Sequence, residues 1–276
     1  MLGHEINPIE IWEIERLARG LGDPTIEAEV AFNHARGLLH EHGDLDAARA
    51  KLLRAQSLVR DHGAAAHLAQ QIRIDFGMIA LWTGDTAVAR EQFTEAMTAA
   101  RAARDRAFEA LALNNLGEAS RFAGADVEAA ACYEESLRLY HALGARTEIP
   151  RLLHNLGYLA LHGGDLALAR TRFAESFAGF RDVAVARGMA EAVAGLAAAA
   201  ACLGTPEAAR AAGRLWGAAA AALAGEGLPI WPADQAEWNR YQPLAQKVLN
   251  GADFAAAQTA GRCLSLETAA SEAGLP

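Results

Sequence analysis

The chain has 276 residues, of which 52% are hydrophobic but only 7% aromatic, so alanine and leucine carry most of the apolar surface. Both residues favour helices, and the β-branched residues that favour strands are sparse. The formal net charge of −9 argues against a nucleic-acid-binding face, which needs a basic patch, so no direct nucleic acid partner is expected.

Cysteine spacing and hydropathy suggest a cytoplasmic protein. Cys132, Cys202 and Cys263 follow no metal or redox spacing, which is typical of a reducing compartment. Glutamates interrupt the first apolar residues, so no secretory signal is expected. The longest apolar run, residues 192–203, is too short to span a bilayer, and no membrane partner is expected.

The chain opens with a short amphipathic helix over residues 5–20, which ends at Gly20 and Gly22. An apolar stripe on such a helix can either cover the first unit of a repeat array or bind a partner. We expect the first role, because terminal units of repeat arrays need a cap.

Five turn glycines separated by 40 or 41 residues then mark a repeated helix pair. Glycine suits the left-handed position that ends a helix, and the Asp or Thr that follows can cap the next helix. A fixed period of this length is the signature of a solenoid. The turn glycines are Gly43, Gly84, Gly124, Gly164 and Gly204.

A second pattern describes how each pair packs. An alanine stands five residues after every turn glycine, and a bulky residue stands nine residues after four of the five. A small residue at the crossing, with large ones a turn either side, lets two antiparallel helices interlock. The sequence Asn-Leu-Gly also occurs in the first helix of two repeats, at 115–117 and 155–157.

These features resemble the tetratricopeptide repeat (TPR) over residues 29–222, in the Leu-Gly of the first helix, the turn glycine, and the Ala and aromatic of the second. The usual period is about 34 residues, and the longer repeat is similar to the MalT-like type. The resemblance implies an all-α fold: a right-handed α-solenoid of about five helix pairs. Residues 1–28 and 223–276 are then an N-terminal capping helix and a C-terminal helical cap.

The tail resembles a more specific group. Residues 214–219 read Arg-Leu-Trp-Gly-Ala-Ala, and residues 260–267 read Ala-Gly-Arg-Cys-Leu-Ser-Leu-Glu. The two motifs are similar to the terminal segment of TPR regions in bacterial LuxR-type and AfsR-like transcriptional regulators. This implies the sensor or interaction module of a signalling or transcriptional regulator, either free-standing or part of a larger ATPase. Ser265 is expected to cap the last helix.

The chain lacks the common sequence motifs of catalytic and nucleotide-binding sites. It contains no HExxH, GxSxG, GxGxxG or phosphate-binding loop. His154 and His162 share a helix face but lie about 12 Å apart along it, too far to share a metal ion. We therefore predict no enzyme activity, no cofactor and no metal.

A stacked-helix solenoid offers a concave groove lined by its first helices. The resemblance implies that this groove binds a protein or peptide, and a small-molecule inducer in the same place stays an alternative. The predicted groove residues are Gln71, Ile74, Met78, Leu111, Asn114, Asn115, Glu118, Arg121, Arg151, His154, Asn155 and Tyr158.

Several of these residues have a structural alternative. The helix asparagines can hydrogen-bond between helices instead of contacting a ligand. His154 and Tyr158 can pack in the core if the longer helices rotate. Arg121 and Arg151 can face solvent, although a guanidinium in a groove can also hold a carboxylate through two hydrogen bonds.

Overall fold

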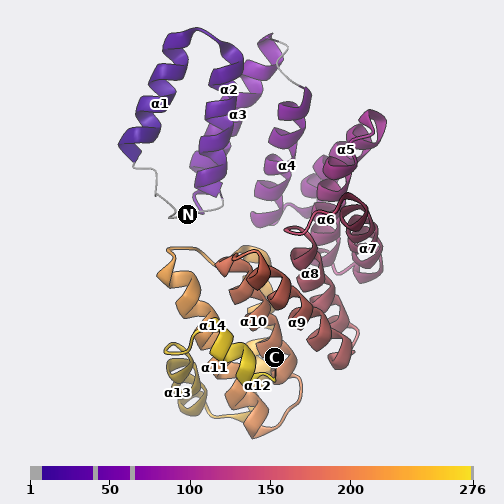
Figure 1. Ribbon diagram of the computed structural model, residues 1–276, viewed down its shortest axis with the longest axis vertical. Helices are drawn as coiled ribbons and strands as arrows, with labels where there is room; N and C mark the ends of the chain where they lie inside the picture. The colour runs from indigo at the N-terminus through magenta and orange to yellow at the C-terminus, as the bar shows by residue number, and fades with distance from the viewer. Residues whose placement is uncertain (1–7, 40–42, 63–65, 275–276) are drawn as a thin grey trace. The chain divides into compact units, whose positions relative to one another are not determined.

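The structure is a computed structural model that describes residues 8–39, 43–62 and 66–274. Within these ranges the regular elements are fourteen helices, and no strand is found there. The helices divide between two compact units, Met1–Ala103 and Arg104–Pro276, which we treat separately (Figure 1). The predicted all-α fold of repeated helix pairs is confirmed.

The N-terminal unit holds the predicted first helix and the first helix pairs. The first helix begins at Pro8, so residues 5–7 of the prediction lie outside the described residues. Asp23 caps the second helix by accepting from the backbone of Thr25 and Ile26. The helices are α1 (Pro8–Leu21), α2 (Pro24–Gly37), α3 (Leu45–His62), α4 (Ala66–Trp82) and α5 (Thr86–Ala103).

The C-terminal unit continues the pairs and ends in three further helices. The two-unit division differs from the predicted cap, repeats and cap, which stay a prediction. The helices are α6 (Arg106–Phe122), α7 (Asp126–Leu143), α8 (Ile149–His162), α9 (Leu166–Asp182), α10 (Ala186–Ala201), α11 (Pro206–Gly225), α12 (Pro232–Val248), α13 (Gly251–Gly261) and α14 (Leu266–Glu272).

The five turn glycines adopt the backbone conformation that the sequence predicts. Their φ angles lie between 68° and 89°, a region that side chains with a Cβ rarely adopt. In four of the five turns the next residue caps the following helix, accepting from a backbone N–H at 2.9–3.2 Å. These caps are Asp44, Asp85, Asp165 and Thr205.

The third turn is different. Ala125 occupies the cap position and has no side chain to accept a hydrogen bond. Asp126 is displaced into the first turn of α7, and its carboxylate faces His162 at 3.2 Å. The displacement therefore frees an acidic side chain for a contact with α8.

Within the helix pairs, a glycine of the first helix receives an aromatic ring of the second. A Cβ added to such a glycine would lie only 2.5–2.7 Å from a ring carbon, far inside ordinary contact distance. The ring therefore needs a helix surface without a side chain at this point. The pairs are Gly77 with Phe93, Gly117 with Tyr133, and Gly157 with Phe173.

The two tail motifs are the two sides of one helix crossing. A Cβ on Gly217 of α11 would overlap the backbone carbonyl of Gln258 in α13, and a Cβ on Gly261 would overlap that of Arg214. The helices thus meet backbone to backbone, which only glycine permits. Ser265 caps α14 by accepting from the N–H of Thr268 at 3.1 Å, as predicted.

We predict that Gly157→Ala lowers the free energy of unfolding by about 1–3 kcal/mol, because the methyl group overlaps the Phe173 ring. Urea unfolding followed by circular dichroism measures the change. Gly225→Ala is the matched control, since nothing lies within 4 Å of the added Cβ. Equal stability of the two variants would contradict the packing argument.

Candidate functional site

The first helices α6, α8 and α10 lie side by side in the C-terminal unit and carry most of the predicted groove residues. We call the surface that they present to α12 the inner face and define it by five residues. These residues are Arg121, Arg151, His154, Tyr158 and Arg187.

The asparagines of the two Asn-Leu-Gly repeats contact one another. Nδ2 of Asn155 donates to Oδ1 of Asn114 at 3.3 Å, and Nδ2 of Asn114 donates to Oδ1 of Asn115 at 3.2 Å. All three side chains are buried, where an amide needs such partners. The structure places these residues between α6 and α8, and ligand contact by them stays a prediction.

Arg121 is buried and forms an ion pair with Glu237 of α12. The alternative that Arg121 faces solvent is therefore wrong, because its side chain is only 3% exposed. Glu237 also lies 3.2 Å from Nε2 of His162, whose Nδ1 lies 3.2 Å from the carboxylate of Asp126. A guanidinium withdrawn from water needs carboxylates placed in this way.

His154 and Tyr158 also contact α12. Nε2 of His154 lies 3.0 Å from Oδ1 of Asp234, and the His154 ring meets the Tyr158 and Phe173 rings edge to face. The Tyr158 ring stacks on Tyr241 with centroids 6.4 Å apart and an angle of 19°. Tyr158 is fully buried in the hydrophobic core, so the packing alternative describes its ring.

Trp231, at the start of α12, lies close to two arginines. The guanidinium of Arg151 is 5.0 Å from the centre of a Trp231 ring and that of Arg187 is 4.5 Å away, which are cation–π distances. Arg151 and Arg187 stand in the first turns of α8 and α10. Since Tyr241 meets Tyr158 further along α8, α12 runs in the same direction as the helices that it covers.

The sequence predicted an open groove at this place, and the structure corrects that prediction. Helix α12 belongs to the segment predicted as a C-terminal cap, and it covers the inner face because Asp234 and Glu237 neutralise donors buried there. Sequence reasoning missed both acids, although their spacing of three residues puts them on one helix face. Of the other predicted residues in this unit, Leu111 and Glu118 are half-buried.

Burial changes the acid–base properties of this cluster. Burial, followed by the charge of Asp234, raises the pKa of Glu191 on α10. Burial likewise raises the pKa of Glu118, and Arg121 partly opposes the shift. Burial would also raise the pKa of Glu237, but the His162 hydrogen bond and the charge of Arg121 outweigh it and lower that pKa. The surroundings of Glu237 therefore favour its charged form, in contrast to those of Glu118 and Glu191.

The remaining predicted groove residues, Gln71, Ile74 and Met78, lie on α4 in the N-terminal unit. Ile74 and Met78 are buried, and Gln71 is half-buried. Asp75, which was not among the predicted residues, lies between Ile74 and Met78 in the sequence; it is a buried acid whose carboxylate lies 3.9 Å from Arg36. Burial raises the pKa of Asp75 to about 7, against the opposing charge of Arg36.

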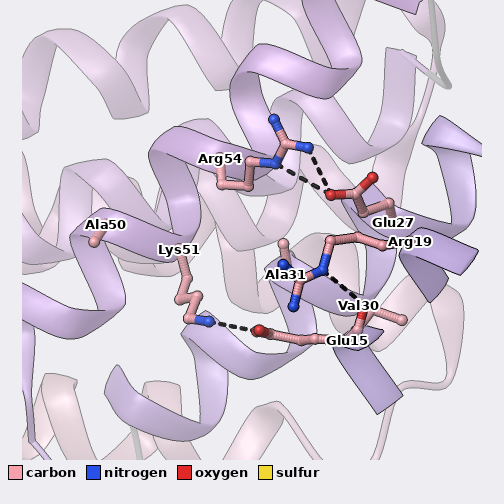
Figure 2. Close-up of a pocket in the computed structure, with 8 residues that line it drawn as sticks. All are labelled: Glu15, Arg19, Glu27, Val30, Ala31, Ala50, Lys51 and Arg54. Atoms are coloured by element: carbon pink, nitrogen blue, oxygen red, sulfur yellow. Dashed lines mark hydrogen bonds and ion pairs between the residues drawn. The ribbon is translucent and has the colours of Figure 1, made fainter. Parts of the chain in front are cut away.

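A pocket of about 400 Å³ lies between α1, α2 and α3 (Figure 2). Four of its charged side chains form ion pairs: Lys51 donates to Glu15 at 2.5 Å, and Arg54 donates to Glu27 at 2.6 Å. Arg19 donates to the backbone carbonyl of Glu15. The pocket is lined by Glu15, Arg19, Glu27, Val30, Ala31, Ala50, Lys51 and Arg54.

In the described part of the chain, no cluster of three or more His, Cys, Asp or Glu side chains is arranged to hold a metal ion. Nor does any helix in residues 8–39, 43–62 and 66–274 combine the length and apolar character needed to cross a bilayer.

Comparison with known proteins supports the fold. No protein-family model and no curated protein sequence matches the chain. The apo form of RapI is similar in structure, with a TM-score of 0.60 and 13% sequence identity over 89% of this chain and 92% of that one. BtubC from P. vanneervenii has a TM-score of 0.49 and 16% identity over 87% and 88% of the two chains. The likeness to RapI is a likeness of fold.

The buried ion pair of Arg121 and Glu237 should make the stability of the chain depend on pH. Because the pKa of Glu237 is lower in the folded chain than its ordinary 4.5, its contribution to stability is present above pH 4.5 and is lost as the pH falls through the folded value. Glu237→Gln should lower the free energy of unfolding at pH 7 by about 3–5 kcal/mol, because it leaves Arg121 buried without a charge partner.

Urea unfolding between pH 3 and pH 7 tests this prediction. The gap between Glu237→Gln and the unaltered chain should narrow towards pH 3. Glu134→Gln, at an exposed position of α7, is the control and should behave like the unaltered chain. A gap that stays constant from pH 7 to pH 3 would contradict the assignment to the Glu237 charge.

Proposed function

We propose that the chain is a non-enzymatic helical-repeat scaffold that binds a protein or peptide, with the inner face of α6, α8 and α10 as the binding surface. One observation carries the proposal: this face already binds a helix, α12, through side chains 80 and 116 residues apart in sequence. A surface that recognises one helix by its charges has the chemistry to recognise another.

The contacts of α12 show which interactions the inner face can make. On the inner face, Arg121 and His154 pair with carboxylates, and the ring of Tyr158 stacks on another ring. Arg151 and Arg187 lie against the face of an aromatic ring. Arginine and tyrosine are over-represented among the residues that dominate binding at protein interfaces.

We further propose a role as the interaction module of a bacterial signalling or transcriptional regulator. The support is the resemblance of the tail to the terminal segment of LuxR-type and AfsR-like regulators. Both tail motifs form the α11–α13 crossing beside the core that holds α12. In this proposal the tail positions the helix that covers the binding surface.

A small-molecule ligand is the second candidate, and a separate observation favours it. Three buried polar atoms at the junction of the inner face with α12 have no hydrogen-bond partner among the described residues: Nε of Arg121, Nδ1 of His154 and the hydroxyl of Tyr158. Buried polar groups left in this state are costly, and a polar ligand would satisfy them.

An unbiased peptide array probed with the full chain tests the first candidate. We expect selective binding that falls about tenfold in Arg151→Ala, since Arg151 is the exposed arginine at the edge of the inner face. The control is Arg210→Ala, at an exposed position of α11, which should bind like the unaltered chain.

Thermal unfolding in the presence of a metabolite library tests the second candidate. A small molecule that binds at a hundred times its Kd should stabilise the chain by about 2.7 kcal/mol and so raise the melting temperature by a few degrees. If neither peptides nor metabolites bind, both candidates fail. Binding of peptides that is equal in the Arg151 and Arg210 variants would refute the inner face as the surface.

A further inference from the structure

Helix α12 presents a defined chemical face to the surface that it covers. Asp234, Glu237 and Tyr241 follow one another at spacings of three and four residues, which places them on one side of a helix. Each of the three meets a residue of the inner face: His154, Arg121 and Tyr158, respectively. The other side of α12, with Gln235, Ala236, Asn239 and Arg240, is exposed.

The inner face is selective for acidic groups. The buried guanidinium of Arg121 needs a carboxylate, because removing one partner of a buried ion pair leaves an uncompensated charge. His162 lies between the carboxylates of Asp126 and Glu237 and can donate to both when its ring is charged. A helix without acids at these positions would leave the donors unsatisfied.

The fit of α12 is incomplete. Besides the unpartnered atoms of Arg121, His154 and Tyr158, the indole nitrogen of Trp238 in α12 is buried without a hydrogen-bond partner. Pro243 lies inside α12, where it removes a backbone hydrogen bond and crowds the preceding turn. A helix without these defects would bind the same surface better.

We propose that the partner of the inner face is an amphipathic helix with two carboxylates three residues apart and an aromatic ring four residues after the second. We further propose that this helix takes the place of α12. The inference rests on the proposed function and names the chemistry of its partner.

Exchange of this kind predicts how the binding of an added helix changes. A binding surface that is covered most of the time has an apparent affinity reduced by the fraction that is open. Weakening α12 alone, as in an Asp234→Asn chain, therefore strengthens binding of an added helix. A change in His154 alone loosens α12 and the added helix alike, so it weakens binding only in the Asp234→Asn chain, where α12 has already lost this contact.

The experiment measures binding of a fluorescent synthetic peptide with the sequence of residues 230–249, acetylated and amidated, to the full chain. We expect Asp234→Asn and Glu237→Gln chains to bind this peptide about tenfold more tightly than the unaltered chain. Added to the Asp234→Asn and Glu237→Gln chains, respectively, His154→Gln and Arg121→Gln should weaken binding at least tenfold. Glu134→Gln should bind like the unaltered chain.

The peptide itself supplies a test that does not depend on how the variant chains fold. Replacing its two acids by Asn and Gln should abolish binding to the Asp234→Asn chain, which circular dichroism must first show to be helical. Equal binding of the acidic peptide and of the peptide with Asn and Gln in place of its acids would overturn the proposal. So would binding to the Asp234→Asn chain that is not weakened when His154→Gln is added.

Failure of the exchange can be told apart from failure of the proposed function. If array peptides lose binding in Arg151→Ala while the α12 peptide binds no variant, the proposed acidic helix is not the partner, and the scaffold function stands. If array peptides without the acidic pair bind as well as those that carry it, the exchange proposal also fails. If no peptide binds at all, both proposals fall together.

Discussion

The fold depends on a contact between an aromatic ring and a glycine in the middle of a helix. In the pairs α4–α5, α6–α7 and α8–α9, the ring fills the space that a side chain on the glycine would take, so the two backbones approach closely. Phe173 does this twice, since its ring also meets Gly195 of the next first helix. The same residue thus closes one pair and fixes the next one against it.

This close packing also determines the chemistry of the inner face. First helices that lie side by side bring Asn114 against Asn155 and bury Arg121 and His154. Buried donors of this kind need acceptors, and the described chain supplies them from α12 as Asp234 and Glu237. Burial is what makes this pairing demanding, because the same residues in an open groove would be satisfied by water.

Much of the fold could be predicted from the sequence, because its signals are local. Turn glycines, caps and the glycine–aromatic spacing each depend on residues within one helix pair. The candidate site was predicted less well: Arg121, His154 and Tyr158 were placed in an open groove, whereas the structure buries all three. Whether such residues face solvent depends on Asp234, Glu237 and Tyr241, which lie more than 75 positions further along the chain and carry no repeat signal.

The helix-pair repeat, its period and the glycines that permit its tight crossings can be read from the sequence, since each follows from backbone conformation and side-chain size over short distances. The place of α12 on the inner face, and the crossing that the two tail motifs form, are properties of the folded chain. Those contacts join segments far apart in the chain. Their stability comes from pairing groups that are costly to bury alone, which no local pattern specifies.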